Sequence, residues 1–135
     1  MADMVDMNGE EVAVPPSDSG SWILTFQEVG CKGCKQQLPA FARFLRKSNI
    51  PRDRVVSVVL GDRKGTEAYE SELGGLGRLL PAGPSVGAFA RALDVSMFPT
   101  YLIVDGDGTV AFATHSSSEL ASAGGRLLTS IAAVR

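Results

Sequence analysis

The sequence has no apolar run long enough to cross a membrane. A membrane-spanning helix needs about 20 apolar residues, and the longest apolar runs here, such as 21–26 and 55–60, have the length of a β-strand. The first residues, MADMVDMNGEEV, lack the basic start and the apolar stretch of a signal peptide. We therefore expect a soluble chain without a membrane span.

An excess of positive charge is also missing, and cysteine is scarce. Thirteen Lys and Arg against fifteen Asp and Glu give a net charge of -2, and no basic stripe is visible. Proteins that bind nucleic acids normally carry such an excess or stripe, so we expect no nucleic-acid partner. Two cysteines cannot form the framework of several disulfides that supports many small secreted domains.

The chain does have the length and composition of one globular domain. Its 135 residues are 44% hydrophobic and 21% charged, enough for one core of the usual ~100–150 residues. We predict a single, monomeric domain with a hairpin and linker in 1–20 and the core in 21–135. Asn8-Gly9 between short apolar stretches indicates the hairpin turn, and the Pro- and Ser-rich stretch before residue 21 indicates the linker.

The residues from 22 to 60 predict a strand, a helix and a second strand. Trp22 to Phe26 is a short apolar run bounded by turn residues, as in a buried strand. From Cys31 to about Lys47, apolar residues recur at helical spacing, so the helix is expected to start at the cysteines. Residues 54–60 are mostly β-branched and apolar, as in a strand covered on both faces. This order predicts a right-handed βαβ unit and a partly parallel sheet.

The second half of the chain predicts two short helices and a hairpin. Residues 66–73 and 85–93 suit helices, separated by a Gly- and Pro-rich stretch to which we assign neither helix nor strand. Residues 100–104 and 109–113 suit two strands joined by a tight turn of Asp and Gly.

A terminal helix is expected from Ser117 onward. Ser116 and Glu119 have the spacing of a capping box, in which each residue bonds to the backbone of the other. Four apolar residues share one helical face that would cover the sheet: Leu120, Leu127, Ile131 and Val134.

The most informative feature is Cys31-Lys32-Gly33-Cys34, at the predicted junction of strand and helix. Cysteines at this spacing in the first turn of a helix come within disulfide range, so the pair can exchange two electrons. The helix N-terminus, Lys32 and Lys35 favour a thiolate at Cys31, which predicts a pKa below the free value of about 8.5. Lys32, Gly33 and Lys35 are thus expected to start the helix and tune this pKa. Cys31 is the expected nucleophile and Cys34, on the apolar face, the resolving thiol.

Other interpretations of the pair remain open. A structural disulfide or two inert core cysteines would have the same spacing, and a CxxC pair also offers two ligands to zinc or copper. Structural zinc needs four ligands, whereas the chain adds only a distant His115, which we interpret as a solvated loop residue. We favour a redox role for the pair, without a cofactor and without a metal site. A copper or zinc carrier and a redox-inert peptide-binding module are the alternatives.

Several features together resemble the thioredoxin superfamily, from about Trp22 to the C-terminus. They are CKGC after a buried strand, Pro39 five residues after the second cysteine, Phe98-Pro99 at the start of a strand, and a closing ββα unit. The resemblance implies a three-layer α/β sandwich with a central mixed sheet flanked by helices, an N-terminal hairpin extension and an insertion between residues 61 and 93. It also implies a cis bond before Pro99, with Phe98 and Pro99 as substrate-binding residues opposite the cysteines.

Within the superfamily, the N-terminal hairpin VDMNGEEVAV, the insertion and the hairpin YLIVDGDGTV resemble the TlpA/ResA type, which includes MauD-like proteins of bacteria. This resemblance implies a thiol-disulfide oxidoreductase with dithiol or disulfide proteins as substrates and an upstream redox partner protein. It favours a location outside the cytoplasm behind an N-terminal membrane anchor, with a cytoplasmic location as the alternative.

Two departures from the family pattern concern proton transfer and the approach to the first cysteine. Many relatives place Trp immediately before that cysteine and an acidic proton relay on the preceding strand or one turn after the second cysteine. Here Gly30, Thr25 and Gln37 hold those positions. Deprotonation of Cys34 therefore needs another route, such as Glu28 or water.

Overall fold

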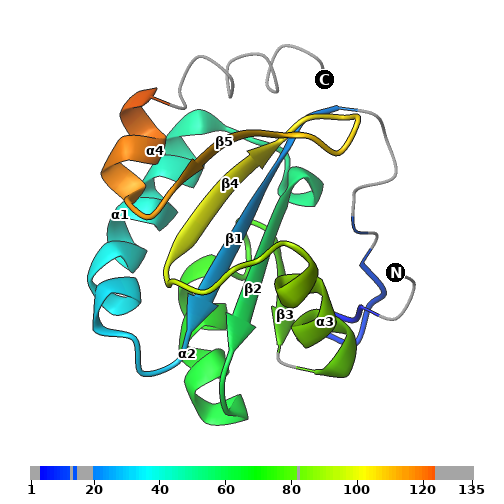
Figure 1. Ribbon diagram of the computed structural model, residues 1–135. Helices are drawn as coiled ribbons and strands as arrows, with labels where there is room; N and C mark the ends of the chain where they lie inside the picture. The colour runs from blue at the N-terminus through cyan, green and yellow to red at the C-terminus, as the bar shows by residue number, and fades with distance from the viewer. Residues whose placement is uncertain (1–3, 13, 15–19, 82, 124–135) are drawn as a thin grey trace.

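The computed structural model describes residues 4–12, 14, 20–81 and 83–123. In this part of the chain, five strands form one mixed sheet in the order β3-β2-β1-β4-β5 (Figure 1). The strands are β1 (Trp22–Glu28), β2 (Val55–Leu60), β3 (Arg78–Pro81), β4 (Thr100–Val104) and β5 (Val110–Thr114). The β1–β2 and β2–β3 pairs are parallel, whereas β1–β4 and β4–β5 are antiparallel.

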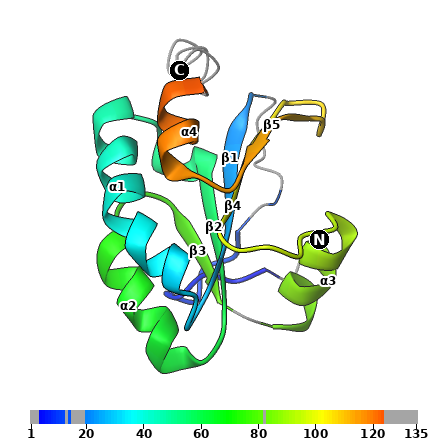
Figure 2. The same cartoon turned by 60° about the vertical axis from the view of Figure 1, so that its left-hand side comes forward.

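Helices cover both faces of this sheet. Three of them, α1 (Lys32–Ser48), α2 (Arg63–Leu73) and α4 (Ser117–Ala123), lie on one face. The fourth, α3 (Pro84–Ala92), lies on the other face together with the N-terminal segment (Figure 2). The predicted α/β sandwich is thus confirmed, and the expected strands and helices in the described residues are present within a few residues of their predicted bounds.

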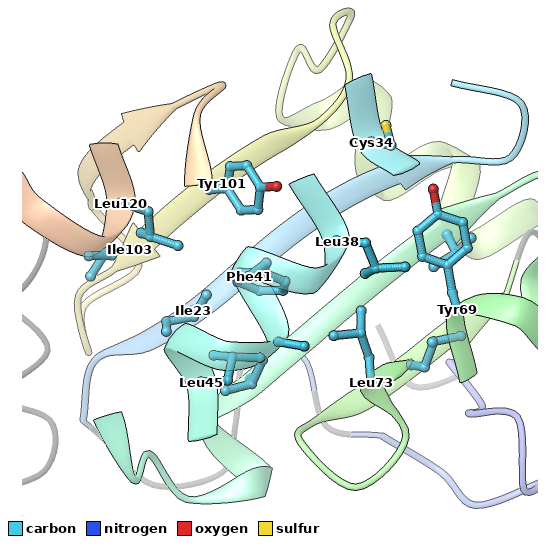
Figure 3. Packing of buried hydrophobic residues seen from close by; sticks show 14 residues of the cluster. Ile23, Cys34, Leu38, Phe41, Leu45, Tyr69, Leu73, Tyr101, Ile103 and Leu120 are labelled. Carbon is cyan, nitrogen blue, oxygen red and sulfur yellow. The ribbon is translucent and has the colours of Figure 1, made fainter. Parts of the chain in front are cut away.

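Alternation along β1 builds two separate apolar layers. Ile23 points to the helices α1, α2 and α4, where it packs with Phe41, Leu45, Tyr101 and others (Figure 3). Leu24 and Phe26 point to the opposite face and pack with residues of α3 and of the N-terminal segment. Because β1 is the central strand, both of its faces are buried, which explains the continuous apolar run.

The strand β3 was missed by the sequence analysis, which assigned no element between the two short helices. Only Leu79 and Leu80 are buried, one in each apolar layer. Gly77 precedes them because a Cβ there would lie 2.8 Å from a methyl group of Val55. Pro81 is tolerated because it ends an edge strand. Such a short strand lacks the length on which an alternation pattern depends.

The N-terminal segment forms a short turn that is attached to β3. Asn8-Gly9 makes the turn, with a single β-bridge between Val5 and Glu11, and Gly9 has a φ of 84°. The Arg78 guanidinium binds the Asp6 and Glu10 carboxylates at 3.3 and 3.0 Å, and a third carboxylate, that of Asp53, at 2.9 Å. The linker predicted over 15–20 lies outside the described residues, apart from Gly20.

The terminal helix begins where predicted, with half of the expected capping box. The Glu119 N–H donates to Ser116 Oγ at 3.2 Å, but the Glu119 carboxylate accepts from the Thr114 hydroxyl rather than from the Ser116 N–H. Leu120 is fully buried against the sheet. Leu127, Ile131 and Val134 lie outside the described residues.

Candidate active site

The two cysteines form a disulfide at the start of α1. Their Cα atoms are 5.3 Å apart, within the usual range for a disulfide. Cys31 is the N-cap of the helix, with extended backbone, and its Sγ accepts a hydrogen bond from the Cys34 N–H at 3.1 Å. A sulfur atom therefore occupies the place of the side-chain oxygen that normally caps a helix N-terminus.

The two sulfur atoms have different environments. Cys31 is half-buried, whereas Cys34 is fully buried among Leu38, Phe41 and other apolar residues below the helix. Lys32 and Lys35 are exposed, and the first turn of α1 contains no acidic residue. Free backbone N–H groups and nearby ammonium groups both favour a thiolate on the outer sulfur. Because a disulfide does not titrate, a lowered pKa for Cys31 stays a prediction for the reduced protein.

Phe98 and Pro99 lie directly against the disulfide. The peptide bond between them is cis. The Phe98 carbonyl oxygen is 3.5 Å from Cys31 Sγ, and a Cβ built on Gly33 would lie 3.8 Å from Pro99 Cδ. The structure therefore brings together all the residues that the sequence analysis selected as the site, although it does not test their roles.

His115 contacts Pro99 and Thr100, which the sequence analysis did not predict. Its side chain is exposed, but Nδ1 lies 3.1 Å from the Pro99 carbonyl oxygen and 3.3 Å from Thr100 Oγ1. Since a carbonyl oxygen only accepts, this geometry requires a proton on Nδ1. Nothing in the sequence signals the contact, because His115 is sixteen residues from Pro99 and lies just after the end of β5.

Gln37, one of the two positions considered above for an acidic proton relay, connects α1 to this region. Its Oε1 accepts from Tyr101 Oη at 3.1 Å and from the Ser117 N–H at 2.7 Å. Its Nε2 donates to the His115 carbonyl oxygen at 3.2 Å. The amide therefore fixes the second turn of α1 to β4 and to the start of α4.

The other relay position, Thr25, belongs to a buried and uncharged polar cluster. Thr25 Oγ1 donates to the Thr100 carbonyl oxygen at 2.9 Å and accepts from Gln27 Nε2 at 2.8 Å. Gln27 Oε1 is buried without a hydrogen-bond partner among the described residues. Burial raises the pKa of Tyr101, whose register partner on β1 is Thr25, to about 12. Glu28, the acid considered as an alternative relay, is exposed at the end of β1.

The described part of the chain contains neither a cluster of metal ligands nor a membrane-spanning helix. Within it, no group of three or more His, Cys, Asp and Glu side chains is placed to hold a metal ion. None of the helices in the same residues is long and apolar enough to cross a membrane.

The sheet order, the helices on both faces and the disulfide at the N-terminus of α1 define a thioredoxin-like fold. No protein-family model matches the sequence, and no curated protein matches it significantly. Solved structures do match. A secreted disulfide oxidoreductase of Mycobacterium tuberculosis, homologous to Escherichia coli DsbE, shares 16% identity at a TM-score of 0.72, with 93% of each chain covered.

Two other solved structures agree with this result. The thioredoxin domain of a thiol-disulfide oxidoreductase from Bacteroides vulgatus has a TM-score of 0.76 at 13% identity, covering 93% of this chain and 91% of the other. StoA from Bacillus subtilis has a TM-score of 0.64 at 20% identity, covering 87% and 91%. The predicted thioredoxin-like fold is thus confirmed, and two of these similar proteins are named as a disulfide oxidoreductase and a thiol-disulfide oxidoreductase.

Proposed function

We propose that the protein is a thiol-disulfide oxidoreductase that exchanges disulfides with protein substrates through Cys31 and Cys34. The observation that carries the proposal is the asymmetry of the disulfide: a half-buried Sγ caps the helix at Cys31, and the other sulfur is fully buried. A structural disulfide needs no such asymmetry, because neither of its sulfurs has to be attacked. A redox-active pair needs one sulfur within reach of a substrate.

The reaction begins from the reduced pair. The Cys31 thiolate attacks one sulfur of a substrate disulfide, which forms a mixed disulfide and releases the other substrate sulfur as a thiolate. Cys34 loses its proton and attacks Cys31 Sγ, so that the second substrate sulfur leaves. Two electrons pass from the dithiol to the substrate, and the same steps in reverse oxidise a substrate dithiol. A second redox protein returns the pair to its starting state.

The residues around the pair have distinct proposed roles. Lys32, Lys35 and the helix N-terminus stabilise the Cys31 thiolate. Phe98 and Pro99 position the substrate chain, because the Phe98 carbonyl oxygen lies 3.5 Å from Cys31 Sγ. Thr25 and Gln37 carry no charge, so the proton of Cys34 leaves through water rather than through a carboxylate at those positions.

Reduction of insulin disulfides by the protein tests the proposal. Replacement of Cys31 by Ser removes the nucleophile, so the rate should fall by roughly a hundredfold or more, to the level of the reaction without protein. The exposed Ser118→Ala variant serves as a control and should keep the wild-type rate. Equal rates for wild type and Cys31→Ser would reject the enzymatic function.

The order of attack is tested separately with the Cys34→Ser variant. This variant can form the mixed disulfide but cannot resolve it, so a covalent complex with the substrate should accumulate and disappear after addition of dithiothreitol. Mass spectrometry should locate the bond at Cys31. A stable complex formed by the Cys31→Ser variant instead would reverse the two roles.

A further inference from the structure

A cavity of about 740 Å³ lies beside Cys31, between α1 and α2. Its volume is in the range of ligand pockets, about 300–1,000 Å³. Much of its wall is nonpolar and comes from the turn before α1 and from both helices: Val29, Leu38, Pro39, Ala68 and Tyr69. In Figure 3, the Tyr69 ring stands beside Leu38 and its hydroxyl points toward the end of α1 that carries Cys34. The cavity therefore opens next to the sulfur that a substrate must reach.

Glycines line this cavity or pack against Val29, one of its lining residues. Gly30, immediately before Cys31, has a φ of 88°, and a Cβ there would meet nothing within 4 Å. Under the cavity, Val29 is packed so closely that a Cβ on Gly61 or Gly65 would come within 2.4 or 2.2 Å of it. The Val29 N–H also bonds to the Leu60 carbonyl oxygen at 2.8 Å. This part of the cavity wall is consequently held in place by the backbone and by the start of α2.

The cavity and the cis proline segment lie on two sides of α1. Gly33 and Gln37, which are four residues apart, face Pro99 and β4. Lys32, Lys35 and Pro39 follow the spacing of a different helical face, and all three line the cavity on the α2 side. A ligand that contacts both places must therefore extend past Cys31 in two directions. A polypeptide can do this, whereas a small disulfide cannot.

The rim of the cavity on α1 carries unpaired positive charge. Lys32 and Lys35 are exposed and line the cavity, and neither forms an ion pair with any of the described residues. The helix N-terminus adds to their field. Among the described residues that line the cavity, Glu72 of α2 is the only acidic one. A substrate carboxylate is therefore attracted to the α1 rim.

We propose that this cavity selects substrates: it takes a large apolar side chain next to the substrate cysteine, and Lys32 and Lys35 bind a carboxylate of the same polypeptide. This inference rests on the proposed function and names the class of substrate for it. The occupied cavity would orient the substrate sulfur toward Cys31 Sγ, while the substrate backbone lies along Phe98. Apolar burial next to the reacting sulfur supplies the binding energy, and the lysines supply the preference for acidic sequences.

This selection can be tested with short peptides that contain one cysteine. The cysteine of each peptide is linked to thionitrobenzoate by a disulfide. The reduced protein attacks the peptide sulfur, coloured thionitrobenzoate leaves, and Cys34 then releases the peptide thiol. We compare second-order rate constants for a peptide with glycine on both sides of the cysteine and for peptides with phenylalanine on either side. Wild type should prefer a phenylalanine peptide by about tenfold, the lower end of what one apolar pocket can discriminate.

The Ala68→Phe variant fills the cavity from the exposed side of α2. Its preference for the phenylalanine peptide over the glycine peptide should fall to nearly one. The matched control is Ala88→Phe, on an exposed position of α3 on the opposite face of the sheet, which should keep the wild-type preference. A wild-type preference close to one, or an undiminished preference in Ala68→Phe, would overturn the proposed selection.

The charge on the rim has its own test. Wild type should react about threefold faster with a peptide that carries glutamate beside the phenylalanine than with one that carries lysine, as for exposed charges. Lys35→Glu should reverse this order, and the control Lys47→Glu, in the last turn of α1, should not. The ratio of the two peptides cancels any change in thiol reactivity. If Lys35→Glu still reacts faster with the glutamate peptide than with the lysine peptide, the lysines do not contribute to substrate selection.

The same assay separates this inference from the proposed function. If all peptides react at equal rates and Cys31→Ser abolishes the reaction, the cavity does not select substrates but the exchange activity stands. If no peptide reacts with the reduced wild-type protein, both proposals are rejected.

Discussion

The two faces of strand β1 are buried to the same extent but differ in polarity. On the face toward α3, Trp22, Leu24 and Phe26 are all at most 4% exposed and belong to an entirely apolar cluster, apart from the indole N–H. On the face toward α1, Thr25 and Gln27 are equally buried beside Ile23. The polar side chains of Thr25 and Gln27 thus lie on the face that also buries Cys34.

The difference shows how the fold divides its tasks. The face toward α3 contributes apolar burial, the main stabilising term in folding. The face toward α1 buries polar groups, which lowers stability, but their hydrogen bonds hold the backbone around the disulfide. Examples are the bonds from Thr25 to the Thr100 carbonyl oxygen and from Tyr101 to Gln37. Substitutions on the two faces should therefore have effects of different size and even of opposite sign.

The largest effect is expected on the apolar face. Phe26→Ala removes a fully buried ring that packs at 5.9 Å from the Phe89 ring, measured between centroids. The free energy of unfolding should fall by about 3–5 kcal/mol, as measured by urea denaturation. Exchange activity per folded molecule should persist, because Phe26 points away from the disulfide. A loss below 1 kcal/mol would contradict the assignment of this face as the main source of stability.

The next effect is a dependence on pH from the face toward α1. Burial raises the pKa of Tyr101 from 10.0 to about 12. The unfolded chain releases this proton near pH 10, whereas the folded protein keeps it, so the stabilisation is complete below pH 10 and is lost as the pH rises to about 12. Over this window wild type should lose about 3 kcal/mol more stability than Tyr101→Phe. Parallel losses in the two proteins would show that Tyr101 titrates normally.

A smaller effect of opposite sign is expected at Gln27. Its Oε1 is buried without a partner among the described residues, and such an atom costs about 1–3 kcal/mol. Gln27→Met keeps the length of the side chain and removes this atom together with the Nε2 bond to Thr25 Oγ1, so the free energy of unfolding should rise by at most about 1 kcal/mol. Thr25→Val is the comparison variant, because it removes a satisfied hydroxyl and should lower stability instead. Destabilisation by Gln27→Met would show that the amide makes a net favourable contribution.

The smallest effect is expected in the first turn of α1. A Cβ at Gly33 would make only an ordinary contact with Pro99 at 3.8 Å. Gly33→Ala should therefore raise stability by at most about 1 kcal/mol through helix propensity, visible as a higher midpoint of thermal unfolding. A marked fall in the midpoint would mean that Pro99 packs more tightly on this turn than the distance indicates.

Local patterns predicted most of the fold. The strands of the central sheet and α1 have strong periodicity, and the CKGC motif marks the start of α1, where Cys31 is the N-cap. The start of α2 was placed three residues late. Asp62 caps this helix by accepting from the Gly65 N–H at 2.7 Å, and Gly65 is present because Val29 leaves no room for a Cβ. From sequence alone, a glycine in the first turn argues against a helix, and the contact with Val29 that explains Gly65 is known only from the folded structure.

The candidate site was predictable only in part. The disulfide pair follows from spacing, and the Phe98–Pro99 segment from the family resemblance. The contacts of Gln37 with Tyr101, Ser117 and His115 join residues 64 to 80 positions apart, so no local pattern indicates them. The cavity beside Cys31 likewise depends on the packing of α2 on Val29, which only the folded chain defines.

The ion pairs of Arg78 connect the stretch between residues 61 and 93 to the start of the chain. Arg78 opens β3, inside the stretch between residues 61 and 93, yet two of its three carboxylate partners, Asp6 and Glu10, come from the first residues of the chain. Met4 and Val12 on the same segment are buried against the sheet. The edge strand β3 therefore anchors the amino-terminal segment. Breaking the Arg78 ion pairs would expose part of the apolar layer on the face of the sheet opposite the disulfide.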